Sequence, residues 1–464
     1  MVKFNVRLHS THRSCLLTVR LSSIESGHAC PPVRETIYHA NVQARKADSE
    51  NSAGWSSVTI VRAMKWLIGL DEAGYGPNLG PLVVALSVWR TSTPTKFPHA
   101  TTPIESATTN SRLGKRTARR KSNVTACPVV PFDDSRLFER LHPEIACRDQ
   151  AKSESWLLVD DSKRLYSGGH TLEPLERVVL GATMRGIVPA TIARLREQLL
   201  SPRIHGSVID RADRSVQPTN ADSRRMSMGA CVTEPEGWRR LGRWSIDSVN
   251  QHDQPWYPSS YPLEPCVDLE ALLSIADRFE RLMKDRQVQL ESVAARQVEP
   301  LEFNAACESW GNKASVLSLT SLSLARDALE RLPDENGAVL CRCDRHGGRA
   351  RYAALLQTVF PDSWINIAEE SPRVSRYCFV HEGREVEMRF EVHGERFLET
   401  AWASIHAKYL RELAMDQLND FWKQLVPGLP PTKGYPTDAK RYRAAIEAAA
   451  RAEGIEPPRY WRAR

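Results

Sequence analysis

The sequence predicts an α/β fold with a central mixed sheet flanked by helices. Two apolar strands, Met64–Asp71 and Val339–Asp344, each end in a carboxylate. Between and after them, apolar residues recur at the spacing of amphipathic helices. Strand-like and helix-like segments therefore alternate along the chain, which is typical of a sheet covered by helices.

The amino-acid composition limits the classes of protein to which this chain can belong. The 464 residues are 41% hydrophobic, so at least one full core is expected. No apolar run approaches the roughly 18 residues of a membrane span. The ten cysteines include no Cys-x-x-Cys pair, which argues against a zinc site and a disulfide framework. We therefore expect a cytoplasmic protein without a membrane partner, and the net charge of +7 suits an anionic partner.

The first half of the predicted fold has two long helices. An apolar strand over residues 81–90 follows a Gly/Pro-rich turn. A helix is expected over Leu172–Leu200, with a break near Pro189. Residues 268–297 are predicted to be one helix, because one face collects Leu269, Leu272, Leu273, Ile275, Ala276 and Phe279.

In the second half of the chain, the predicted helices and strands alternate at shorter intervals. A helix over residues 312–332 begins beside Asn312, a good N-cap, and ends at Leu332-Pro333. Further elements are then expected: a helix over 351–359, a strand pair over 374–381 and 384–393, and helices over 400–422 and 437–452.

Three segments do not fit this pattern. Residues 1–63 show no sustained periodicity, so we expect a disordered extension or a translation start at Met64. Residues 91–130, which are basic and rich in Ser, Thr and Pro, and residues 201–265 are expected to be disordered inserts. A single domain would then span residues 64–464.

Acidic residues end both apolar strands. Asp71 and Glu72 follow the first strand inside a Gly-rich segment, Asp344 ends the second, and a long helix carries Glu412. Carboxylates that converge without basic partners repel one another unless cations bind there. Such oxygen ligands suit Mg²⁺ or Mn²⁺.

Four segments in order resemble motifs of the ribonuclease HII family. They are Ile68–Pro77 with the following Gly80–Ala85, then Asp161–Leu165, Ala403–Glu412 and Lys433–Thr437. The resemblance implies a ribonuclease H-like fold. It also implies an endonuclease that hydrolyses the RNA strand of RNA/DNA hybrids, including ribonucleotides embedded in DNA. The products would have 5′-phosphate and 3′-hydroxyl ends.

The resemblance also implies site residues. Asp71, Glu72, Asp344 and Glu412 would be the catalytic residues and would bind two divalent cations, Mg²⁺ or Mn²⁺. The partner would be an RNA/DNA hybrid or ribonucleotide-containing DNA, bound by a monomer. The residues expected to contact nucleic acid are Gly74, Tyr75, Gly76, Ser162, Lys163, Ser404, Lys408, Lys433 and Tyr435.

Two departures from the family pattern leave alternatives open. Tyr75 stands where the family usually has Arg, and Glu412 stands where it usually has Asp. Asp416, one helical turn later, could take the role of Glu412. A catalytically impaired hybrid-binding module, or a related nuclease with an altered substrate, is therefore the alternative function. His406 is either a proton donor or a packed helix residue.

Overall fold

A computed structural model of the chain describes residues 2–11, 14–23, 64–92, 137–167, 171–200, 254–333 and 337–463. The chain divides into two compact units, Met1–Arg62 and Ala63–Arg464. In the first unit, β1 (Val2–Thr11) and β2 (Ser14–Ser23) form an antiparallel pair that the sequence pattern did not indicate. The expectation of a start at Met64 stays a prediction.

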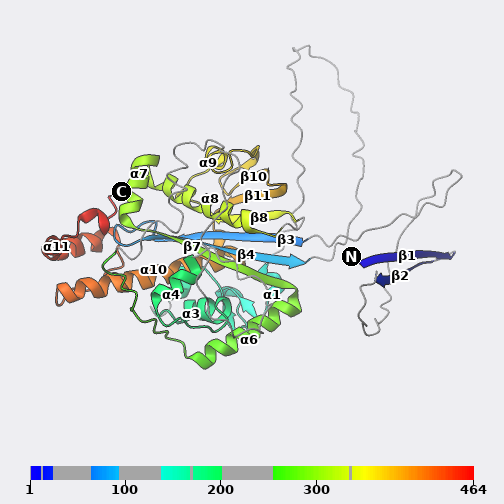
Figure 1. Ribbon diagram of the computed structural model, residues 1–464, viewed down its shortest axis with the longest axis horizontal. Coiled ribbons are helices and arrows are strands. Elements are labelled where there is room, and N and C mark those ends of the chain that lie inside the picture. Colours follow the sequence, from blue (N-terminus) through cyan, green and yellow to red (C-terminus); the bar gives the residue numbers. More distant parts are fainter. Residues whose placement is uncertain are drawn as a thin grey trace, which may run out of the picture. The chain divides into compact units, whose positions relative to one another are not determined.

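The second unit is built on a seven-stranded mixed sheet (Figure 1). Its order is β7-β4-β3-β8-β11-β10-β9, and only the β3–β8 and β8–β11 pairs are parallel. The predicted α/β class, with a central mixed sheet flanked by helices, is confirmed. The strands are β3 (Met64–Ala73), β4 (Leu82–Ser92), β7 (Val288–Val298), β8 (Val339–Asp344), β9 (Asn366–Glu370), β10 (Val374–His381) and β11 (Arg384–Glu391).

Helices cover both faces of this sheet. In Figure 1, α7, α8 and α9 lie on one side, and α3, α4, α6 and α10 lie on the other. The main helices are α2 (Ser162–Ser167), α3 (Glu173–Glu176), α4 (Ile192–Leu200), α6 (Leu269–Arg286), α7 (Pro300–Trp310), α8 (Lys313–Arg331), α9 (Ala353–Val359), α10 (Leu398–Leu425) and α11 (Pro436–Ala452). Shorter elements are α1 (Leu137–Leu141), the two-residue strands β5 (Ile145–Ala146) and β6 (Leu157–Leu158), and the π-helical turn Arg177–Thr183.

Strand alternation divides the core into two layers. Leu67 of β3 and Leu340 of β8 belong to the layer under α10 and α6, whereas Ile68 and Cys341 belong to the layer under α7 and α8. Because alternate residues of a strand lie on the same face of the sheet, this assignment also gives the face on which each later residue of β3 and β8 lies. Asp344 therefore lies on the α10 face.

One predicted helix is wrong in its second half. The expected helix over 268–297 ends at Arg286, because Gln287 adopts a left-handed conformation with φ 52°. Residues Val288–Val298 then form β7, which pairs with β4 at the sheet edge. The prediction failed because its Ala, Glu and Gln residues favour helix, while pairing with β4 favours strand.

The predicted inserts are only partly described. Residues 93–130 and 201–253 lie outside the described residues. Residues 254–265, expected to be disordered, are described, and Trp256 packs against Trp422 of α10 with ring centroids 6.5 Å apart. This burial of apolar surface anchors the end of the segment in the core.

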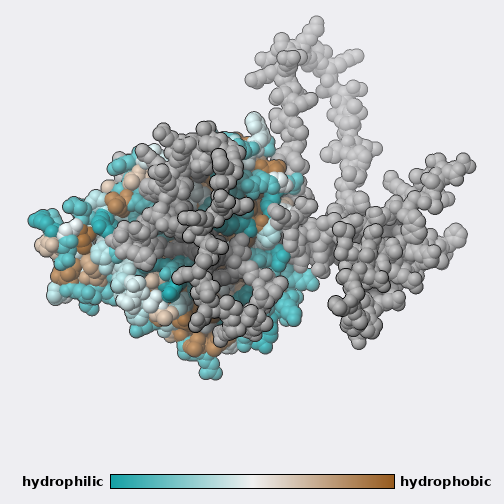
Figure 2. Space-filling model, in the orientation of Figure 1, coloured by the Kyte–Doolittle hydropathy of each residue, from teal (hydrophilic) through white to brown (hydrophobic). Residues whose placement is uncertain are grey.

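The described surface in Figure 2 is mostly hydrophilic, with separate hydrophobic residues between the polar ones. Within the described ranges, no helix is both long and apolar enough to cross a membrane.

Candidate active site

Two acidic residues lie at the end of β3, where the chain turns into β4. Gly74 follows them with φ +88°, a conformation that favours glycine. A Cβ atom at Gly74 would lie only 2.3 Å from Nε of Arg411, so α10 packs directly against this turn. The turn therefore holds Asp71 beside α10, where Ser404 hydrogen-bonds it.

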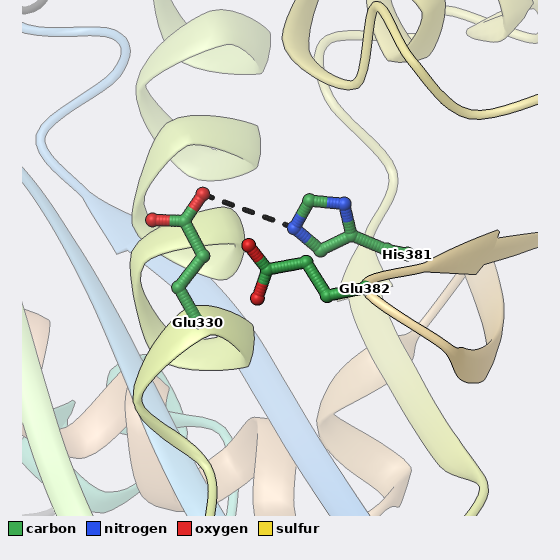
Figure 3. A group of neighbouring side chains, drawn as sticks. All are labelled: Glu330, His381 and Glu382. Carbon is green, nitrogen blue, oxygen red and sulfur yellow. Dashed lines mark ion pairs between the residues drawn. The ribbon is translucent and has the colours of Figure 1, made fainter. Parts of the chain in front are cut away.

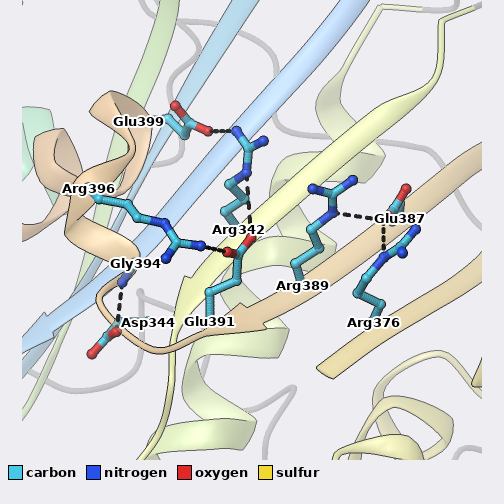
Figure 4. A network of polar contacts seen from close by, with 9 residues as sticks. All are labelled: Arg342, Asp344, Arg376, Glu387, Arg389, Glu391, Gly394, Arg396 and Glu399. Atoms are coloured by element: carbon cyan, nitrogen blue, oxygen red, sulfur yellow. Dashed lines mark hydrogen bonds and ion pairs between the residues drawn. The ribbon is translucent and has the colours of Figure 1, made fainter. Parts of the chain in front are cut away.

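Asp344 lies on the neighbouring parallel strand at the same level. Leu70 of β3 is in register with Cys343 of β8, so Asp71 and Asp344 each follow the last register pair. Both residues take the α10 face by strand alternation. The N–H of Gly394 donates a hydrogen bond to Oδ1 of Asp344 at 3.0 Å (Figure 4).

The nearby arginines have other partners. Arg342 pairs with Glu399, and Arg345 donates to the carbonyl oxygens of Ser371 and Pro372. These contacts direct both guanidinium groups to acceptors other than Asp344.

Burial and neighbouring carboxylates raise the pKa of Asp71 and of Glu72. Burial raises the pKa of Asp71 well above its usual range, and the charges of Glu72 and Asp344 raise it further. Burial and the charge of Asp344 raise the pKa of Glu72 to about 7, although Lys163 acts in the opposite direction. Groups of like charge held together in this way favour binding of a proton or a cation.

Glu412 has a different environment. It is buried in α10, and its two carboxylate oxygens accept from the Nζ atoms of Lys408 and Lys433, each at 2.6 Å. Burial alone would raise its pKa, but the two lysines outweigh this and lower the pKa to about 2. Glu412 is therefore an ionised carboxylate whose charge the protein already compensates.

Asp416 lies one turn further along α10. Burial raises its pKa, Lys433 opposes this, and Glu412 and Asp420 add to the rise. Lys433 thus lies near both candidates for the fourth acid. The choice between Glu412 and Asp416 stays open.

Basic and aromatic side chains surround these acids. Lys408 lies over the ring of Tyr166 with Nζ 4.4 Å from the centroid, and Lys433 lies 5.5 Å from the same centroid. Lys163 lies in the first turn of α2. Burial lowers its pKa, but the charges of Asp161, and then of Asp71 and Glu72, raise it above its ordinary value. Sequence reasoning missed Tyr166, although it lies one turn after Lys163 on the short helix of the Asp-Ser-Lys motif.

Two of the predicted nucleic-acid contacts are buried serines. Ser162 and Ser404 are 3% and 2% exposed, and their hydroxyl groups hydrogen-bond each other at 2.9 Å. Ser404 also hydrogen-bonds the carboxylate of Asp71. These serines connect α2, α10 and the acid at the end of β3, and phosphate contact by them stays a prediction.

The Gly74–Gly76 turn contains one tyrosine, Tyr75, and lies beside a second, Tyr435. A Cβ atom at Gly76 would lie 4.0 Å from Cε1 of Tyr435, which is 54% exposed. Tyr75 instead lies beside Lys313 of α8, whose Nζ is 4.9 Å from the ring centroid. Tyr435 is thus next to the turn and accessible, while Tyr75 extends toward a lysine that the sequence did not identify.

His406 does not have the environment of a proton donor. It is fully buried, and its Nδ1 lies 2.7 Å from the carbonyl oxygen of Trp402. Burial lowers its pKa to about 4, so it is neutral near pH 7. The structure favours the packed helix residue over the proton donor.

A second group of ligand-type side chains lies away from the acids. The ligand atoms of Glu330, His381 and Glu382 lie within 4.8 Å of one another (Figure 3). Among the described residues, this is the only group of three or more that meets this distance. Arg326 already pairs with Glu330 at 2.6 Å. His381 is in register with Arg384, the first residue of β11, whereas Asp344 is in register with Glu391, the last residue of β11, so the two groups lie at opposite ends of this strand.

Comparisons with known proteins give structural similarity only. No family model and no curated protein matches the sequence. The chain is similar to the RNase HII structure from the PCNA:RNase HII complex of Archaeoglobus fulgidus, with 13% identity, a TM-score of 0.29, and coverage of 85% of this chain and 93% of that chain.

Two further solved structures are similar to the chain. For ribonuclease H2 from Pyrococcus horikoshii OT3 the values are 13% identity, a TM-score of 0.30, and coverage of 85% and 92%. For Bst-RNase HIII in complex with Mn²⁺ the identity is 12% and the TM-score is 0.30, with coverage of 86% of this chain and 66% of that chain. These identities are too low to assign the chain to a family.

Proposed function

We propose that this protein is a metal-dependent endonuclease that hydrolyses the RNA strand of RNA/DNA hybrids, including ribonucleotides embedded in DNA. The observation that supports this most strongly is the position of three acids at the ends of two adjacent parallel strands, where burial raises the pKa of two of them, Asp71 and Glu72. The ordered motifs of the sequence, which resemble ribonuclease HII, support the choice of substrate.

The acids suit divalent cations. Asp71, Glu72 and Asp344 offer carboxylate oxygens, the hard ligands that Mg²⁺ and Mn²⁺ prefer. When bound, two such cations supply an activated water molecule and charge stabilisation for phosphodiester hydrolysis. Glu412 already has two lysine partners, so its participation requires it to exchange one of them.

The remaining residues bind and orient the substrate. Lys163, Lys408 and Lys433 present ammonium groups beside the acids, which suits phosphate oxygens of the nucleic-acid backbone. Gly76 is exposed, so its backbone suits contact with a ribose 2′-hydroxyl, the group that distinguishes RNA from DNA. The exposed ring of Tyr435, adjacent to Gly76, would pack against the neighbouring sugar.

A hybrid-binding module without catalysis is the second candidate. It is favoured by the two short contacts that compensate the charge of Glu412. A protein of this kind would bind hybrids through its lysines without hydrolysing them.

Cleavage assays distinguish the two functions. We expect the full-length protein to cut a DNA duplex carrying one ribonucleotide, and a long RNA/DNA hybrid, in Mg²⁺ or Mn²⁺ but not in EDTA. Cleavage of the long hybrid alone would contradict recognition of the embedded ribonucleotide by the Gly74–Gly76 turn. Binding of both substrates without cleavage in either metal would reject the nuclease and support the binding module.

The metal site should make stabilisation by Mg²⁺ dependent on pH. Because the pKa of Glu72 is raised to about 7 from 4.5, the metal-free protein loses stability as pH rises through this interval. This carboxyl group is roughly nine-tenths protonated near pH 6 and roughly nine-tenths ionised near pH 8. We therefore expect a larger Mg²⁺-induced rise in the melting temperature near pH 8.

Differential scanning fluorimetry at both pH values measures this effect. The variant Glu72→Gln, which has no titrating group at this position, is the control and should show a weaker pH dependence. Equal stabilisation by Mg²⁺ at the two pH values in the unmodified protein would contradict the assignment of Glu72 as a ligand.

A further inference from the structure

An arginine is buried inside β8, two residues before Asp344. The side chain of Arg342 is 1% exposed and lies on the α10 face, the same face as Asp344. Burying a charged side chain is costly unless it is paired. The partners of Arg342 therefore indicate what the residue contributes.

Arg342 contacts two acids on different elements. Its Nη1 donates to Glu399 in the first turn of α10, and its Nε lies 3.8 Å from Glu391 at the end of β11 (Figure 4). The guanidinium carbon is also 3.9 Å from the ring centroid of Phe397, which precedes α10. One side chain thus joins β8, β11 and the start of α10.

The start of α10 lies directly on the strands that end in acids. A Cβ atom at Gly69 of β3 would lie 2.1 Å from the carbonyl carbon of Glu399, and Gly69 is the register partner of Arg342. The hydroxyl of Ser87 on β4 donates to the carbonyl oxygen of Glu399 at 2.7 Å. The backbone of Glu399 therefore packs on β3 at Gly69, two residues before Asp71. Its side chain pairs with Arg342 of β8, two residues before Asp344.

Glu391 extends this network to the hydrogen-bond donor of Asp344. Glu391 is the register partner of Asp344 and also pairs with Arg396 (Figure 4). Gly394, between Glu391 and Arg396 in the sequence, donates its N–H to Asp344. A Cβ atom at Gly394 would lie 2.9 Å from the Cα of Asp344, so this turn packs tightly against the acid.

We infer that Arg342 is a positioning residue, which fixes Asp344 relative to Asp71 by joining the first turn of α10 to the turn that donates to Asp344. This inference rests on the proposed function. Arginine suits the role because its planar guanidinium can engage two carboxylates at once, whereas lysine presents a single point charge. Active-site carboxylates need placement within about 0.5 Å of the productive geometry.

The test compares Arg342→Lys with a matched control, Arg389→Lys. Arg389 is the register partner of Arg342 on β11, but it pairs with Glu387 at 2.7 Å (Figure 4). We expect Arg342→Lys to lower kcat by at least about ten-fold at unchanged KM, and to weaken the Mg²⁺ dependence of stability. Arg389→Lys should change kcat and the Mg²⁺ dependence of stability by less than about two-fold.

A second variant separates positioning from stability. In Arg342→Met combined with Glu399→Met, both charges of the buried pair are replaced by apolar side chains, and Glu391 keeps Arg396. Such replacements are often neutral for stability. We expect a melting temperature near that of the unmodified metal-free protein, together with the same loss in kcat.

The outcomes separate this inference from the proposed function. Unchanged kcat and unchanged Mg²⁺ stabilisation in folded variants would overturn the positioning role. If the unmodified protein cleaves no hybrid, the proposed function fails. Mg²⁺ stabilisation of the two variants then still decides whether Arg342 positions the acids.

Discussion

Asp71→Asn is expected to abolish cleavage of RNA/DNA hybrids. The asparagine amide has the size of the carboxyl group but no charge, so it is a poor ligand for Mg²⁺ or Mn²⁺. We expect a loss of at least about 10³-fold in kcat, which corresponds to roughly 4 kcal/mol. Steady-state cleavage of a long hybrid in Mg²⁺ measures it.

The fold should survive this substitution. Burial, Glu72 and Asp344 all raise the pKa of Asp71, so loss of its charge removes repulsion in the metal-free protein. The melting temperature without metal should be equal or higher. Asp362→Asn, at an exposed position after α9, is the control and should retain full activity. Retention of more than about a tenth of the activity by Asp71→Asn would argue against a catalytic role.

Gly69→Ala is expected to destabilise the fold severely. The added methyl group would lie 2.1 Å from the carbonyl carbon of Glu399, 2.2 Å from its oxygen and 2.4 Å from the nitrogen of Thr400. These are backbone atoms of a long helix, so they cannot rotate away as a side chain would. We expect the free energy of unfolding to fall by about 3 kcal/mol or more.

Chemical denaturation of the metal-free protein measures this loss. Gly76→Ala is the matched control, because the nearest atom to its Cβ, Cε1 of Tyr435, lies at 4.0 Å and its φ is not in the left-handed range. That variant should stay within about 1 kcal/mol of the unmodified protein. Equal stability of the two variants would contradict the close packing of α10 on β3.

The central strands were predictable and the outer ones were not. β3 and β8 are largely apolar because both faces of the inner sheet are covered, and Arg342 is the charged exception inside β8. β9 was missed because Asn366–Glu370 contains one β-branched residue and lies at the sheet edge, where little burial is required. The start of α8 beside Asn312 was predicted correctly; Asn312 caps the helix, and capping depends on local sequence.

In the candidate site, too, some features were predictable from the sequence and others were not. The acids at the ends of β3 and β8 were predicted from sequence because each follows an apolar strand, and the parallel register of the two strands is what the structure adds. The contact between Lys433 and Glu412 joins residues 21 positions apart, and that between Arg342 and Glu399 joins residues 57 apart. No local pattern encodes such pairs, and they depend on how α10 packs on the sheet.

Analysis of the product ends tests the central claim most directly. Water attack supported by the carboxylates of Asp71, Glu72 and Asp344 predicts a 3′-hydroxyl on the upstream fragment and a 5′-phosphate on the downstream fragment. Mass spectrometry of the cleaved hybrid, from reactions with Mg²⁺ and with EDTA, identifies both ends. A 2′,3′-cyclic phosphate, formed equally in EDTA, would mean that the RNA's own 2′-hydroxyl attacks and would contradict the proposed role of the acids.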